Sequence, residues 1–93
     1  MPKPTVNRHV RHIYLFITES PYGTEIYPYG TYQRATRALH ARMEELFKNA
    51  RLSEKEQKPH RERYRLHDSY ELPLSSEPFS YAEHGYILTK ETL

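Results

Sequence analysis

Residues 31–50, TYQRATRALHARMEELFKNA, decide the fold that this sequence predicts. Apolar side chains recur there every three or four residues, which is the period of one face of an α-helix. They are Tyr32, Ala35, Leu39, Met43, Leu46 and Ala50, with Phe47 beside them. Thr31 suits the N-cap, because its hydroxyl can accept a hydrogen bond from the first turn. We therefore predict a helix from Tyr32 to about Asn49 that buries this stripe against a sheet.

Residues 9–18, HVRHIYLFIT, form the clearest predicted strand. Side chains alternate along a strand, so its apolar residues fall on both sides. These residues are Ile13, Leu15 and Ile17 on one side, and Tyr14 and Phe16 on the other. This distribution indicates a central strand with a helix over one face.

Residues 21–31, PYGTEIYPYGT, contain the word PYGT twice. In the first copy, proline and glycine make the turn of a hairpin; in the second, Gly30 ends a strand before the Thr31 cap. That second strand is EIYPY, residues 25–29. Pro28 cannot donate to a ladder, so this strand should lie at the sheet edge. We interpret the repeat as turn chemistry used twice, in preference to a duplicated binding motif.

The second half of the chain is less patterned. We predict a charged, flexible connection at about residues 51–60 and then a strand that presents a basic row: Arg61, Arg63, Arg65 and His67. The apolar residues Tyr70, Leu72 and Leu74 then alternate with other residues, as in a strand. A short helical turn is predicted from residue 77 to a stop at Gly85, and residues 86–92 are predicted to form the last strand. The predicted fold is α+β: a single domain, residues 1–93, with a small antiparallel sheet (ββα, then one or two strands) and one amphipathic helix packed on one face.

Composition and charge limit the function classes. There is no cysteine, no apolar run long enough for a membrane helix and no apolar stretch typical of a signal peptide, so we expect a soluble, cytoplasmic protein. Residues 69–93 carry one lysine against four glutamates, whereas the chain before them is net basic. A net charge of +2 is low for a dedicated nucleic-acid binder.

Catalytic patterns are absent from the sequence. The six histidines share no ligand spacing, and there is no nucleophile motif or glycine-rich phosphate loop. We therefore predict no catalytic residues, no metal and no cofactor.

One stretch nevertheless resembles an enzyme family. HIYLFITE at 12–19, EIYPYG at 25–30 and a helix with an arginine and a histidine three apart are similar to the opening of a GIY-YIG nuclease. The resemblance implies Tyr14 and Tyr27 (or Tyr29) as the family's tyrosines, Arg37 as its arginine and His40 as its histidine. His12 occupies the place of the family's first glycine, and no later segment matches its metal-binding glutamate. A degenerate nuclease is the second alternative function.

Exposed tyrosines provide the preferred interpretation. One helix cannot cover all of Tyr22, Tyr27 and Tyr29, and tyrosine beside arginine is typical of protein interfaces. We therefore predict a partner-binding set of these three residues with Arg34 and Arg37. In size and layout the chain resembles small proteins of phages and mobile elements, such as anti-CRISPR inhibitors, which implies a protein or nucleoprotein target. We expect a non-catalytic binding protein, an inhibitor or regulator, and consider a homodimer through the edge strand.

The first alternative is a small nucleic-acid-binding module. Arg61, Arg63, Tyr64 and Arg65 combine positive charge with an aromatic ring, and the helix start would add to this segment, residues 58–67.

Overall fold

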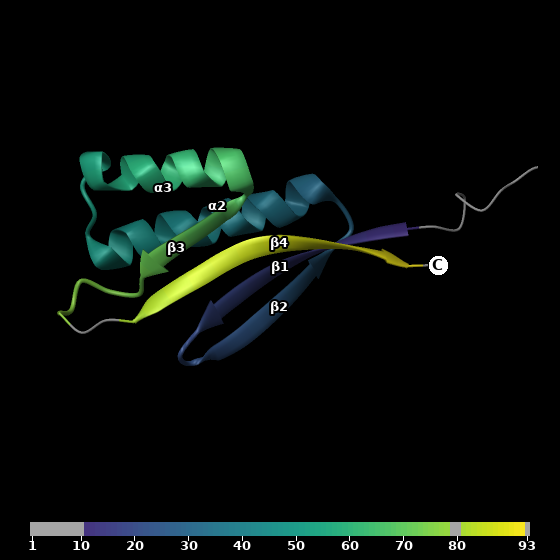
Figure 1. Cartoon of the computed structure of the whole chain (residues 1–93), viewed down its shortest axis with the longest axis horizontal. Helices are drawn as coiled ribbons and strands as arrows, with labels where there is room; N and C mark the ends of the chain where they lie inside the picture. The colour runs from purple at the N-terminus through teal and green to yellow at the C-terminus, as the bar shows by residue number, and fades with distance from the viewer. Residues whose placement is uncertain (1–10, 79–80, 93) are drawn as a thin grey trace, which may run out of the picture.

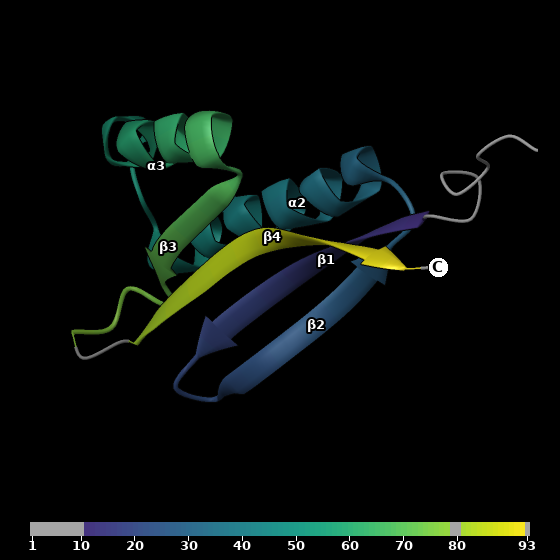
Figure 2. The same cartoon turned by 45° about the vertical axis from the view of Figure 1, so that its right-hand side comes forward.

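The computed structural model describes residues 11–78 and 81–92 and shows an α+β fold (Figure 1). In chain order the elements are β1 (Arg11–Ser20), β2 (Gly23–Tyr29), α2 (Tyr32–Ala50), α3 (Glu54–His67), β3 (Ser69–Pro73) and β4 (Ala82–Thr92). The four strands form one antiparallel sheet in the order β2-β1-β4-β3. Figure 2 shows both helices on the same side of this sheet.

The predicted ββα unit is confirmed. β2 lies at the edge of the sheet, as Pro28 required, and α2 ends only one residue beyond its predicted end. The Thr31 hydroxyl accepts a hydrogen bond from the Arg34 amide at 3.2 Å, and Arg51 ends the helix in the left-handed conformation with φ 57°. The predicted stripe is buried apart from Tyr32, which is exposed and packs edge-on against Tyr14.

The core lies between α2 and the inner face of the sheet. Its centre combines Phe16 of β1 with Tyr70 and Leu72 of β3 under the apolar stripe of α2. Burying these side chains removes them from water at about 1.5–3 kcal/mol each, which is the main contribution to the stability of this layer. Neither described helix is long and apolar enough to cross a membrane.

The predicted connection and basic strand were wrong, because residues 54–67 form α3. Ser53 and Glu56 make a reciprocal capping box at its start, where each side chain bonds the other residue's backbone amide. The first turn is acidic and the last turn basic, which suits the helix dipole. α3 therefore forms although Pro59 lies inside it and none of its residues is fully buried.

The predicted helical turn ending at Gly85 was also wrong. Gly85 lies inside β4, paired with Tyr70 on one side and Thr18 on the other. The strand starts at Ala82, and pairing with both β1 and β3 satisfies its backbone more fully than an isolated turn would. Residues 79–80 of the predicted turn lie outside the described residues.

Candidate functional site

A groove lies between α2 and β2, on the helix side of the sheet. Its wider part has a volume of about 410 Å³ and is lined on the strand side by Phe16, Tyr27 and Tyr29, and on the helix side by Ala38, Ala41 and Glu45. A narrower part of about 290 Å³ shares Thr18, Glu25 and Arg42 with the first and continues to the β1–β2 turn. We call the two parts together the α2–β2 groove.

The groove is aromatic because of strand parity. Tyr27 is paired with Phe16, so both rings project toward the helix layer, where they stack with centroids 5.8 Å apart. Ala38 and Ala41 end at Cβ and do not reach across to these rings. Tyr27 consequently remains 39% exposed, although it lies on the core side of the sheet.

Carboxylates give the groove a polar rim. The Tyr27 hydroxyl donates to Glu25 at 2.8 Å, and this bond raises the pKa of the Tyr27 hydroxyl. Arg42 forms ion pairs with two carboxylates: its Nη2 lies 2.7 Å from Glu83, and its Nη1 lies 2.7 Å from Glu45. Glu25 and Glu45 are both exposed, so the rim keeps an acidic character.

The three predicted tyrosines all line this groove. Tyr22 lies at the hairpin end, is 77% exposed and packs edge-on against Tyr81 with ring centroids 5.6 Å apart. Arg34 lies one helical turn before Ala38 on α2, but it is not one of the residues that line the groove. Arg37 does not line this groove, because it lies in a cleft on the other side of α2.

That second cleft, between α2 and α3, has a volume of about 370 Å³. Gln33, Thr36, Arg37 and His40 line it from α2, and Tyr64 lines it from α3. The His40 and Tyr64 rings are 5.2 Å apart. The sequence did not predict this cleft, because the pattern around Tyr64 indicated a strand and not a helix that lies beside α2.

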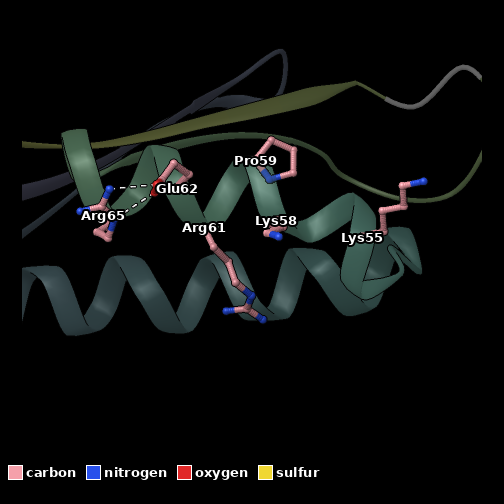
Figure 3. A pocket seen from close by; sticks show the side chains of 6 residues that line it. All are labelled: Lys55, Lys58, Pro59, Arg61, Glu62 and Arg65. Carbon is pink, nitrogen blue, oxygen red and sulfur yellow. Dashed lines mark hydrogen bonds and ion pairs between the residues drawn. The ribbon is translucent and has the colours of Figure 1, made fainter.

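The predicted basic row is dispersed around α3. A pocket of about 520 Å³ lies on this helix. Figure 3 draws the side chains that line it, among which Arg65 bonds Glu62 and Arg61 extends toward α2. Arg61 pairs with Glu44 and lies 4.9 Å from the Phe47 ring centroid. Arg63 bonds Ser69 at 3.0 Å and lies 3.7 Å from Glu71. Each of the three arginines thus meets a carboxylate, so little unbalanced charge is left for phosphates.

The residues that resemble the nuclease set do not converge. Tyr14 and Tyr29 pair across β1 and β2, on the same side of the sheet as Tyr27, whereas Arg37 and His40 lie in the α2–α3 cleft. Within residues 11–78 and 81–92, no group of three or more His, Asp or Glu side chains could hold a metal ion.

Comparison with protein-family models, with curated proteins and with solved structures found no match for this chain. Its surfaces are therefore interpreted from their own chemistry.

Proposed function

We propose that this is a non-catalytic binding protein that holds a segment of a protein or nucleoprotein partner in the α2–β2 groove. The observation that carries the proposal is the placement of Tyr22, Tyr27 and Tyr29 along one groove beside the edge strand. Tyrosine rings offer large contact areas and lose little conformational entropy on binding, which is why interfaces are enriched in them.

The chemistry of the groove defines the partner segment. An apolar side chain would enter the 410 Å³ part against Phe16 and Tyr27, and a lysine or arginine would reach the acidic rim at Glu25 and Glu45. The seven residues of β2 span about 23 Å, so an extended segment of similar length fits alongside. Its backbone could also bond the sheet edge, except at Pro28, which has no N–H to offer.

A binding protein that catalyses no reaction acts by covering a surface of its target. The resemblance in size and layout to small phage and mobile-element proteins such as anti-CRISPR inhibitors supports an inhibitor or regulator. A chain without cysteine is also compatible with action in the cytoplasm.

Filling the groove tests this function. Ala41→Trp would place a large ring in the groove at an exposed position, whereas Lys58→Trp adds the same ring to the exposed surface of α3. In affinity purification from a nuclease-treated lysate at high salt, we expect one protein to be retained by the wild type and by Lys58→Trp but lost by Ala41→Trp. Equal retention by both variants would contradict the proposal.

A second candidate partner is single-stranded nucleic acid in the α2–α3 cleft. The observation in its favour is the meeting of Arg37, His40 and Tyr64, which offer charge and a ring for stacking. This function predicts oligonucleotide binding that weakens steeply with salt and is lost in Arg37→Ala and Tyr64→Ala but kept in Ala41→Trp. Anisotropy titrations of a labelled oligonucleotide distinguish it from the protein-binding function.

A further inference from the structure

The side of the sheet that faces away from both helices is largely apolar. Residues paired across antiparallel strands point to the same side, so Leu15, Pro28 and Leu88 form one row, and Ile17, Ile26 and Tyr86 form the next. Ile13 of β1 lies on the same side of the sheet as Leu15 and Ile17. We call this surface the open face. Ile26 is 56% exposed and Leu88 46% exposed, and no described element covers them, whereas Ile17 between Ile26 and Tyr86 is buried.

Charges mark the two ends of the open face with opposite signs. Arg11 and Lys90 lie at one end, where β1 begins and β4 ends. Glu19 lies at the other end, in the row that continues through His84 to Glu71 of β3. Glu71 is paired with Arg63 at 3.7 Å, and His84 lies 3.8 Å from Glu19, so the negative charge of this end rests on Glu19. The Tyr86 hydroxyl donates to Glu19 at 3.0 Å and so fixes this carboxylate on the open face.

We propose that a second copy of this chain covers the open face, giving a twofold dimer whose two sheets pack face to face with their strands reversed. A twofold axis perpendicular to the strands places the basic end of one copy over the acidic end of the other. An axis parallel to the strands would instead stack like charges. The pattern is therefore self-complementary in one arrangement only, as an isologous interface requires.

The size of the open face suits such a dimer. Nine residues of β1 at about 3.3 Å each, and four strands about 4.8 Å apart, give a surface of about 30 by 19 Å. Because β2 has seven residues and β3 only five, two copies would bury at most about 1,100 Å² in total. This area lies just below the range of stable specific interfaces and indicates a weak, reversible dimer. Sheets that pack in this way cross at about 30° and lie about 10 Å apart.

The other occupants fit the charges less well. Residues 1–10 contain Lys3 and Arg8 and no carboxylate, and they join β1 at the basic end of the open face. An unrelated partner would have to reproduce both charge signs and the apolar centre, whereas a second copy supplies them by symmetry.

The first test is the oligomeric state of the full chain. Sedimentation equilibrium from about 1 to about 500 µM should show a reversible dimer of the 11.2 kDa chain. Leu88→Glu places a charge in the apolar centre and should raise the dimer dissociation constant more than tenfold. Leu66→Glu, on α3 and 58% exposed, is the matched control and should leave it unchanged. A monomer at every concentration, or equal effects of both substitutions, would overturn the proposal.

A charge exchange tests the arrangement. Glu19→Lys and Lys90→Glu should each weaken the dimer several-fold, and the double variant should recover most of the loss. Because Glu19→Lys also removes the bond from Tyr86, Tyr86→Phe measures that loss separately, and thermal melts establish that each variant is folded. Losses that add in the double variant would show that the two ends do not meet and would overturn the antiparallel dimer.

Discussion

Gly85 lies opposite Tyr70 in the β3–β4 ladder, and the ring of Tyr70 fills the space that a side chain at position 85 would need. A Cβ at Gly85 would overlap Cε2 and Cζ of that ring. Since Tyr70 is fully buried among the core side chains, it has no room to withdraw. Glycine is thus required here for close packing and not for an unusual backbone angle.

Gly85→Ala should therefore destabilise the protein by about 3 kcal/mol, the cost of forcing extra volume into a packed core. Chemical denaturation measures the change. Gly30→Ala is the control, because no atom lies within 4 Å of its added Cβ, and it should change stability by less than about 0.5 kcal/mol. Tyr70→Leu combined with Gly85→Ala should be less than additive, since the smaller side chain removes the overlap. A fully additive double variant would contradict this account.

Glu83 is the other residue whose role follows from its neighbours. It is a buried carboxylate on β4 that accepts from Arg42 Nε at 2.9 Å, from Arg42 Nη2 at 2.7 Å and from the Tyr70 hydroxyl at 2.5 Å. Burial alone raises the pKa of Glu83, but the hydrogen bonds from Arg42 and Tyr70 together outweigh it and hold the pKa below 4.5. The ionised Glu83 therefore stabilises the fold above about pH 4.5, and this contribution is lost as the pH falls through the lowered value.

Arg42→Met should reverse that dependence. Without Arg42 the buried Glu83 carboxylate is unpaired, so the free energy of unfolding at pH 7 should fall by about 3 kcal/mol. Burial then raises the pKa of Glu83 in the folded state. A raised carboxyl pKa means that the folded state binds the proton more tightly, so the variant should gain stability as the pH falls from 7 to 5. Urea titrations at several pH values measure this, with Arg42→Met/Glu83→Gln as the reference without the titrating group. Parallel curves for the variant and the reference would contradict the prediction.

At the scale of elements, α2 could be predicted and α3 could not, for one physical reason. α2 buries one continuous stripe, so the period of its apolar residues is visible in the sequence. α3 has no fully buried residue and is held by contacts such as Arg61 over Phe47 and Tyr64 beside His40, which leave no such period. The signal that could have found it is the Ser53-x-x-Glu56 capping box, which Pro59 and the dense charge concealed.

Pro59→Ala should stabilise α3. Pro59 lies in the sixth position after the Ser53 cap, where a proline cannot donate to the carbonyl of Lys55 and crowds the preceding turn. Alanine restores the donor, and we expect the free energy of unfolding to rise by about 1–2 kcal/mol after allowing for the more flexible unfolded chain. Circular dichroism during urea denaturation measures this, with Lys58→Ala as a neighbouring control expected to change little. A loss of stability would mean that the Pro59 ring makes a contact that α3 needs.

For the whole molecule, the sequence indicated which residues are exposed on each surface but not how the fold brings them together. Tyr22, Tyr27 and Tyr29 could be identified because an edge strand exposes its side chains. The groove itself depends on small residues of α2 lying across from Tyr27, which is a tertiary relationship. The apolar parity of Ile13 and Ile17 was equally visible, but the open face exists only because both helices lie on the other side.

The dimer across the open face would still leave the edge of β2 exposed on each copy, and we expect Pro28 to protect this edge. A proline in an edge strand withholds an N–H from any strand that pairs with it, and such devices limit assembly through sheet edges. Pro28→Val restores the backbone N–H at position 28 and introduces a β-branched side chain, which favours strand pairing. Edge pairing combined with face pairing links dimers into chains that do not close.

We therefore expect Pro28→Val to form species larger than the dimer as its concentration rises, measured by size-exclusion chromatography with light scattering. Pro78→Val makes the same substitution outside the strands and should behave as the wild type. In Pro28→Val/Leu88→Glu, which lacks the face contact, growth should stop at an edge-paired dimer. Larger species in that double variant would show that the edge alone propagates assembly, and no growth in Pro28→Val would show that Pro28 is not what protects it.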